Sequence, residues 1–224
     1  MRCVITGGTG FIGSNLALHL IEQGDEIIIT GHDAEQKLPP FKGRYLQPTF
    51  LGFDWDSVGK VDALFHQAAI NDTTNMDRDQ MLKANFESSK QLFEKMVDMG
   101  CRRIVYASST AVYGDLPAPY KEHVPLKPLN PYAESKKALD EFAMNFAKEH
   151  PDVIIVGLRY CNVYGPREDH KGKRASMIYQ LAQQMINGNP RIFKYGEQKR
   201  DYIYVKDVVT ANMLAAKAKE SCIV

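Results

Sequence analysis

The hydrophobic residues of this chain follow two alternating patterns. Short, almost continuous apolar runs predict buried β-strands, at 2–6, 26–30, 61–66, 102–108 and 152–159. Longer stretches with helical spacing lie between them, at 11–24, 76–99 and 131–149. Strands that are apolar throughout and separated by helices form parallel sheets covered on both faces. The pattern therefore predicts an α/β fold with a doubly wound parallel sheet.

After residue 160 the pattern becomes less regular. A turn-rich segment is followed by a helical pattern at about 173–187, then by the strand-like run DYIYV and a last helix. We expect this part, 161–224, to be a small substrate-binding lobe over the carboxyl edge of the sheet, with elements that return to a nucleotide-binding domain formed by 1–160. A further short strand is expected near 45–50.

Composition narrows the class of protein. The chain has 224 residues and a formal net charge of +1, without a long basic run, so neither a nucleic-acid surface nor a membrane-binding face is expected. Its four cysteines are scattered with no CxxC pair, and no metal site is predicted. The apolar runs are far shorter than the ~20 residues of a membrane span, and no secretory signal precedes the first strand. We expect a soluble cytoplasmic protein.

The stretch GGTGFIG at 7–13 lies between the first predicted strand and the first predicted helix. It matches G-x-G-x-x-G through Gly10 and Gly13 together with Gly7 or Gly8. Glycines in this context allow a tight turn and bring the backbone close to a pyrophosphate, which is held at the helix N-terminus. The sequence therefore predicts a Rossmann domain that binds a dinucleotide coenzyme.

The end of the second strand bears on which coenzyme is bound. An Asp or Glu there would bind the adenosine ribose and repel a 2′-phosphate, but the strand ends in Thr30 and Gly31. Asp33 is a candidate for the ribose, whereas His32 or Lys37 is a candidate for a 2′-phosphate. NAD and NADP both stay open as the cofactor.

Tyr132 and Lys136 are placed four residues apart near the start of a predicted helix, so they share one helical face. A free tyrosine has a pKa of ~10 and is a poor base, but a neighbouring ammonium favours the phenolate. Upstream, Ser108 and Ser109 end a predicted strand, where a hydroxyl can bind a substrate alcohol. The alternative is an ordinary surface helix; the glycine loop and the serines favour catalysis.

Several motifs extend this constellation across the chain, namely GGTGFIG, HQAA at 66–69, YASSTAVYG at 106–114, PYAESK at 131–136 and RYCNVYGP at 159–166. In these motifs the chain resembles the extended short-chain dehydrogenase/reductase superfamily of nucleotide-sugar epimerases and dehydratases. The resemblance implies a catalytic Ser109, Tyr132 and Lys136. It implies a coenzyme site that includes, beside the glycines and the catalytic pair, Phe11, Ile12, His32, Asp33, Ala68, Ala69 and Asn85.

The second lobe is similar to the ADP-glycero-manno-heptose 6-epimerases, in NVYGPREDHKGKRAS at 162–176 and in FKYGEQKRDYIYVKDV at 193–208. This similarity implies that Lys171 is a second acid/base and that Asn162, Arg200 and Ser109 bind substrate. A solvated turn lysine and a surface ion pair are the structural alternatives for Lys171 and Arg200. The acidic pair of the dehydratases is absent beside Ser109, which argues against dehydration and for epimerisation or simple redox.

The resemblance implies a nucleotide-sugar epimerase that oxidises its substrate transiently with a tightly held NAD(P), on an ADP-heptose. A UDP-hexose 4-epimerase and a non-catalytic dinucleotide-binding regulatory or scaffold protein are the alternatives. Relatives of this kind are longer, so the substrate lobe is expected to be incomplete. They also lead us to expect a homodimer or higher homo-oligomer, formed through the helices at 76–99 and 131–149.

Overall fold

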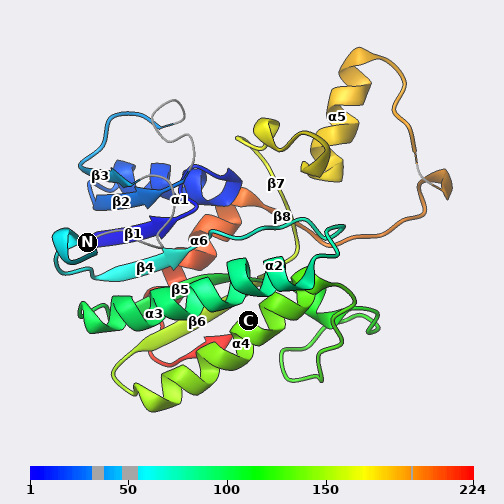
Figure 1. Cartoon of the computed structure of the whole chain (residues 1–224). Helices are drawn as coiled ribbons and strands as arrows, with labels where there is room; N and C mark the ends of the chain where they lie inside the picture. Colours follow the sequence, from blue (N-terminus) through cyan, green and yellow to red (C-terminus); the bar gives the residue numbers. More distant parts are fainter. Residues whose placement is uncertain (32–37, 47–54, 193) are drawn as a thin grey trace.

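The predicted parallel sheet is confirmed by the structure, a computed structural model that describes all residues except 32–37, 47–54 and 193. Among the described residues, the main sheet has seven strands in the order β3-β2-β1-β4-β5-β6-β9 (Figure 1). Every neighbouring pair is parallel. The strands are β1 Arg2–Thr6, β2 Glu26–Thr30, β3 Gly43–Leu46, β4 Ala63–His66, β5 Arg103–Ser109, β6 Ile154–Tyr160 and β9 Cys222–Ile223.

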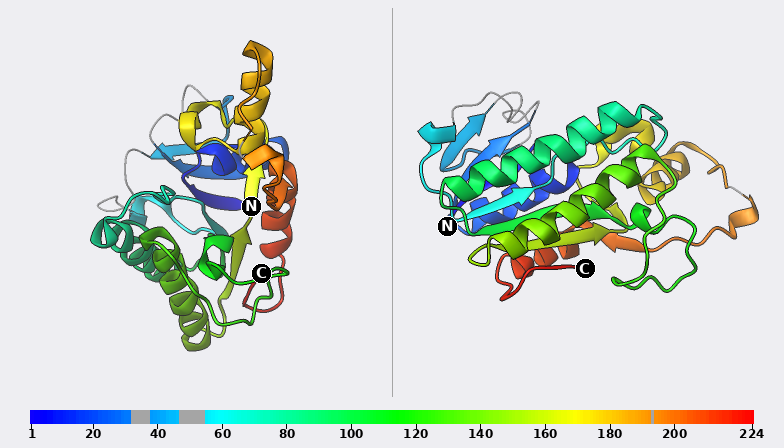
Figure 2. Two further views of the ribbon diagram at one scale, coloured as in Figure 1. Left: turned by 90° about the vertical axis from the view of Figure 1, so that its right-hand side faces the viewer. Right: turned by 60° about the horizontal axis from the view of Figure 1, so that its bottom comes forward.

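The strand order reverses direction between β1 and β4, because the chain builds β2 and β3 on one side of β1 and then crosses to the other. Ligands of open α/β sheets bind at such a reversal, outside the carboxyl ends of the strands. Two groups of helices cover the faces (Figures 1 and 2). One face carries α1 Phe11–Glu22 and α6 Val205–Ala215, and the other carries α2 Arg78–Leu82, α3 Ser88–Asp98 and α4 Pro131–Glu149.

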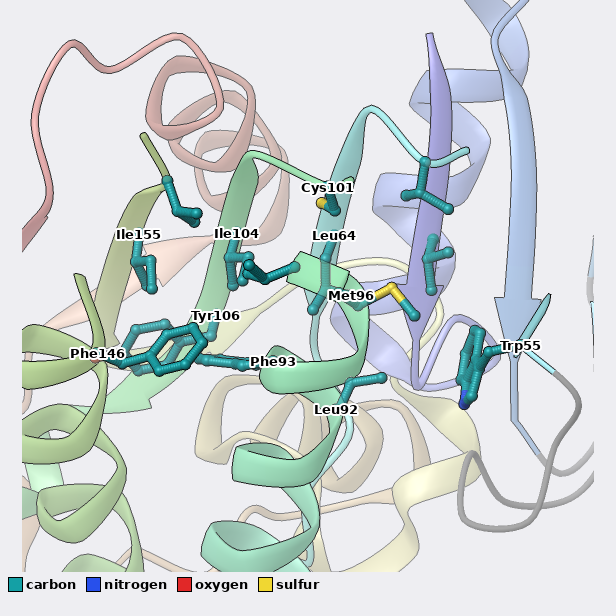
Figure 3. Packing of buried hydrophobic residues seen from close by; sticks show 14 of the residues in the cluster. Trp55, Leu64, Leu92, Phe93, Met96, Cys101, Ile104, Tyr106, Phe146 and Ile155 are labelled. Carbon is teal, nitrogen blue, oxygen red and sulfur yellow. The ribbon is translucent and has the colours of Figure 1, made fainter. Parts of the chain in front are cut away.

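The core on the α3 and α4 face is built from alternate residues of the strands (Figure 3). Ile104 and Tyr106 of β5 point into this layer, whereas Val105 between them belongs to the layer under α1 and α6. This alternation follows from the period of two of a β-strand. Phe93 of α3 packs on Tyr106 with ring centroids 5.8 Å apart.

The helix expected over 76–99 is formed, but it contains a π-helical turn, Lys83–Glu87, between α2 and α3. Asp77 caps its start by accepting a hydrogen bond from the backbone N–H of Gln80 at 2.9 Å. Gly100, with φ +87°, follows its end. The π turn inserts one extra residue into the helix and brings the buried Asn85 to the side facing α4.

In the second lobe, the helix expected from about 173 begins later, because α5 spans Met177–Asn187. A 3-10 turn, Asp169–Arg174, precedes it, and Gly172 within that turn has φ +54°, which an α-helix does not accommodate. Ser176 then caps α5, accepting from the N–H of Tyr179 at 3.1 Å. The strand expected near 45–50 is β3 in part; the remainder of that range lies outside the described residues.

Not all of 161–224 stands apart from the sheet. β7 Asn162–Tyr164 and β8 Tyr202–Tyr204 form a separate parallel pair, and α5 projects from the sheet's carboxyl edge (Figures 1 and 2). In contrast, α6 packs against α1, and β9 pairs with β6. The proposed boundary at residue 160 stays a prediction. Within the described ranges, no helix has the length and apolar character needed to cross a membrane.

We predict that Phe93→Ala lowers the free energy of unfolding by ~3–5 kcal/mol. Phe93 of α3 is fully buried against α4 and the sheet, so its truncation leaves a cavity. Gln91→Ala, at an exposed position of the same helix, is the control and should change stability by less than about 0.5 kcal/mol. Urea unfolding measures both. Equal effects of the two variants would contradict the packing described here.

Candidate active site

The glycine loop makes a tight turn between β1 and α1, and its close backbone contacts leave no room for larger side chains. Gly7 has φ +65°, and the N–H of Gly10 donates to its carbonyl at 2.9 Å. A Cβ on Gly13 would lie 2.2 Å from that same carbonyl oxygen, and a Cβ on Gly7 would lie 2.9 Å from Cα of Ala68. Helix α1 therefore begins directly against the loop and against the segment that follows β4.

The loop fits the pyrophosphate of a dinucleotide. Gly10 is the N-cap of α1 and offers no side-chain cap, so the first N–H groups of the helix are available to an anion. These residues border a cavity of about 460 Å³, lined by the loop, by the segment after β4 and by the turn before α5. The coenzyme residues expected from the sequence that line it are Gly7, Gly10, Phe11, Ile12, Gly13, Ala68 and Ala69.

The absence of an acidic residue at position 31 has a steric reason. A Cβ on Gly31 would lie 2.1 Å from Oγ1 of Thr9, which is buried in the glycine loop. A side chain at 31 therefore requires Thr9 to move. His32 and Asp33, the other expected contacts of the adenosine ribose, lie outside the described residues.

Tyr132 and Ser109 meet at a second, larger cavity of about 510 Å³. Tyr132 is the second residue of α4, whose start is set by Pro131 and by Asn130, which accepts from the N–H of Ala133 at 2.9 Å. Ser109 is the last residue of β5. A hydrogen bond with Ser109 lowers the pKa of Tyr132, but burial has the larger effect and raises it.

Lys136 is 2% exposed, and its ammonium donates to the carbonyl oxygen of Ala107 at 2.7 Å. Nζ lies 5.9 Å from the centroid of the Tyr132 ring. Burial lowers the pKa of Lys136 to about 8, and the Asp140 carboxylate acts in the opposite direction. The lowering of the Tyr132 pKa by Lys136 stays a prediction; burial, which removes the phenol from water, raises that pKa.

Lys171 reaches the site from the turn before α5. Its ammonium lies 5.1 Å from the centroid of the Phe11 ring, at the start of α1. It lines the larger cavity together with Tyr132, and it also lines the smaller cavity. Burial lowers the pKa of Lys171, Glu168 raises it, and Arg174 lowers it further. Lys171 is thus half-buried at the junction of the two cavities, unlike a solvated surface lysine.

Asn85 lines neither cavity but holds the segments that do. Its amide accepts from the N–H of Ile70 at 2.8 Å and donates to the carbonyl of Ile70 at 2.9 Å. It also donates to Oγ of Ser135 at 3.1 Å, and this hydroxyl donates to the carbonyl of Tyr132 at 2.7 Å. The structure therefore places Asn85 behind the site, where it joins the segment after β4 to the first turn of α4.

A buried histidine completes the support. Nδ1 of His66 lies 2.6 Å from Oγ1 of Thr6, and Nε2 lies 2.7 Å from Oγ of Ser89. The Ser89 hydroxyl donates to the carbonyl of Asn85, so Nε2–H donates to Ser89 and Nδ1 accepts from Thr6. Oγ1 of Thr6 in turn accepts from the N–H of Ala68 at 3.3 Å. Neutral His66 therefore connects Thr6, at the end of β1, through Ser89 of α3 to the π turn.

The predicted substrate residues and several others meet at the larger cavity. Asn162 and Arg200 both line it, and Nδ2 of Asn162 donates to the carbonyl of Asp201 at 3.0 Å. Sequence reasoning missed Gln67, Asn71 and Arg174, which line both cavities. Gln67 lies inside the HQAA motif and Arg174 inside the motif at 162–176, so both could have been found there.

The two serines at the end of β5 differ in their contacts. Ser109 is hydrogen-bonded to Tyr132. Ser108 also lines the larger cavity, but its buried Oγ has no hydrogen-bond partner among the described residues. The structure therefore pairs the tyrosine with the second serine of the motif.

Comparison with known proteins agrees with this geometry. Residues 3–223 match the NAD dependent epimerase/dehydratase family, and the chain belongs to that family. The ADP-L-glycero-D-manno-heptose-6-epimerase of Helicobacter pylori is 37% identical, with a TM-score of 0.88, over 99% of this chain and 75% of that protein. The UDP-N-acetylglucosamine 4-epimerase of Methanobrevibacter ruminantium, in complex with UDP-N-acetylmuramic acid, is 29% identical, with a TM-score of 0.91, over 100% and 75%.

A third solved structure bears on the cofactor. It is a complex with UDP-glucose and NAD, and it is 28% identical with a TM-score of 0.88, over 100% of this chain and 75% of that one. The predicted cofactor, NAD or NADP, is confirmed at the level of the family and of these neighbours. The assignment of individual residues to coenzyme and substrate stays a prediction.

We predict that His66 makes stability depend on pH. Burial, with a smaller effect of Lys136, lowers the pKa of His66 from 6.5 to about 3. Between these values the unfolded chain binds a proton that the folded chain does not, so the free energy of unfolding falls as the pH drops from 6.5 toward 3.

His66→Gln keeps one donor and one acceptor but does not titrate, so it should reduce this slope, to which one group contributes at most about 1.4 kcal/mol per pH unit. His123→Gln, at an exposed position, is the control. Urea unfolding from pH 7 to pH 4 measures the slope. An identical slope for wild type and His66→Gln would refute the neutral histidine.

Proposed function

We propose that this chain carries the site of a nucleotide-sugar epimerase that oxidises its substrate and then reduces it with inverted stereochemistry. The observation that supports this most is the position of two proton-transfer groups, Tyr132 and Lys171, on one cavity. They come from α4 and from the turn before α5. Inversion through a planar carbonyl requires proton transfer in two orientations of the substrate, or at two places in the site.

In the proposed reaction, Tyr132 removes the proton of the substrate hydroxyl while Ser109 holds the oxygen. A bound NAD or NADP would accept the hydride and return it to the other face. Lys136, with its charge next to Tyr132, holds the coenzyme ribose and favours the phenolate. Since burial raises the pKa of Tyr132, the enzyme needs further positive charge at the site for the phenolate to form near neutral pH.

The cavity also suits a charged, hydroxyl-rich substrate. Arg200 and Arg174 bring two guanidinium groups to its wall, and Asn162 adds an amide. Guanidinium groups bind phosphate in a bidentate manner, as a nucleoside diphosphate requires. We propose an ADP-heptose as the substrate, because the heptose 6-epimerase is the more similar in sequence of the epimerases compared above.

The UDP-hexose 4-epimerase is the second candidate. It is favoured by the overall likeness to the UDP-sugar epimerases, with TM-scores of 0.91 and 0.88 for two of them. In that reaction a single acid/base, Tyr132, serves both faces after the intermediate rotates, and Lys171 has no proton to transfer. Association of two copies through the helices at 76–99 and 131–149 stays a prediction in either case.

Tyr132→Phe is expected to lower the rate of substrate oxidation by at least ~100-fold, because it removes the base and retains the ring. The rate is followed by the absorbance of reduced nicotinamide after addition of ADP-heptose or UDP-hexose to the protein and coenzyme. Tyr120→Phe, at an exposed position, is the control. Near-normal turnover of Tyr132→Phe would refute the mechanism.

Lys171→Met separates the two candidates. It keeps an apolar side chain of similar length over Phe11, so it removes the ammonium with little change in packing. A heptose 6-epimerase is expected to lose inversion but to keep partial reduction of the coenzyme. A 4-epimerase should retain inversion. Product stereochemistry, measured by NMR, distinguishes these outcomes, with Lys173→Met of the same turn as an exposed control.

A further inference from the structure

The turn that carries Lys171 is organised around a buried carboxylate, Glu168. Glu168 is only 2% exposed, although it lies between two charged residues, the half-buried Arg167 and the exposed Asp169. Oε1 accepts from the N–H of Gly165 at 3.0 Å and from Oγ of Ser176 at 2.9 Å, and Oε2 accepts from the N–H of Ser176 at 2.7 Å. A carboxylate with three such donors is stable when buried.

These hydrogen bonds close the segment 165–176 into a loop, because Gly165 and Ser176 lie at its two ends. Ser176 is also the N-cap of α5. The position of α5 at the rim of the larger cavity is therefore set through the same carboxylate, and Glu168 acts on more than its own turn.

Two further contacts fasten the loop to α1. Nδ2 of Asn15 donates to the carbonyl of Pro166 at 3.0 Å, and Nε of Arg167 donates to Oγ of Ser14 at 2.9 Å. Both partners on α1 lie within its first turns, next to the glycine loop. The loop is thus held against the helix end that borders both cavities.

Lys171 is the residue of this loop that enters the site. Its backbone N–H donates to the carbonyl of Glu168 at 3.0 Å, and its ammonium lies over the Phe11 ring. In the described part of the chain, the charges that affect Lys171 are those of Glu168 and Arg174, both in its own loop. Tyr132 and Lys136 of α4 line the larger cavity together with Lys171.

We infer that Glu168 is a positioning residue for Lys171: its carboxylate closes the 165–176 loop so that the ammonium lies over Phe11 between the two cavities, and its negative charge stabilises that ammonium. The inference rests on the proposed function only for the catalytic use of Lys171. Burial lowers the pKa of Lys171, and Glu168 is the first cause that opposes it.

The test measures the protonation of Lys171 without any turnover. The full chain is treated with trace acetic anhydride over a range of pH, and the labelling of Lys171 is quantified by peptide mass spectrometry. Glu168→Gln should shift the midpoint of Lys171 labelling down by about 1 pH unit, as expected for loss of a close opposite charge. Asp169→Asn removes an exposed carboxylate of the same turn and should leave the midpoint unchanged. Equal midpoints in wild type and Glu168→Gln would overturn the inference.

A second variant separates charge from geometry, and it also applies if Glu168→Gln does not fold. Glu168→Asp keeps the charge but is too short to reach both Gly165 and Ser176. The labelling midpoint should remain near that of the wild type, while backbone amide exchange in 169–176 should accelerate by at least ~10-fold. Unchanged exchange would overturn the positioning role. Neither readout uses substrate, so failure of the epimerase proposal in the Lys171→Met assay is a separate result.

Discussion

The side-chain amide of Asn85 is the interaction on which the candidate site depends, because it joins two parts of the chain that bring different chemistry. On one side it exchanges two hydrogen bonds with the backbone of Ile70, in the segment that borders the coenzyme cavity. On the other it donates to Ser135, whose hydroxyl donates to the carbonyl of Tyr132. A buried amide with all partners satisfied specifies one arrangement, since any shift leaves a polar group unpaired. The π turn places Asn85 there.

Two opposing effects act on the pKa of each lysine in the site: burial, and a carboxylate that lines neither cavity. Lys136 is buried beside Asp140, which is itself paired with Arg159 at 3.0 Å and accepts from the hydroxyl of Tyr106 at 2.9 Å. Lys171, in the second lobe, interacts electrostatically with the carboxylate of Glu168 as Lys136 does with that of Asp140. In each case burial lowers the pKa of the lysine and a carboxylate opposes this. Such tuning brings amines toward the range in which they exchange protons near neutral pH.

The comparisons identify the family of the protein, whereas the choice between the reactions of that family depends on the geometry of the site. Membership of the NAD dependent epimerase/dehydratase family accounts for the sheet order, the glycine loop and the paired Tyr132 and Lys136. The family name covers elimination as well as inversion, so the distinction depends on side chains. Ser109 is followed by Thr110 and Ala111, and Oγ1 of Thr110 donates to the carbonyl of Tyr160. No carboxylate stands at these positions to remove a proton for elimination, which is why inversion is the favoured reaction.

The sequence by itself determined the parallel sheet, the glycine loop and the shared face of Tyr132 and Lys136, because these depend on residues close together in the chain. It did not show that β9 pairs with β6, nor that Lys171 lies over Phe11. Nor did it show that burial raises the pKa of Tyr132. Only the tertiary structure decided these points, since each depends on burial or on contacts between segments far apart in sequence. The local pattern of residues along the chain does not reveal how far a group is removed from water or which distant segments pack together.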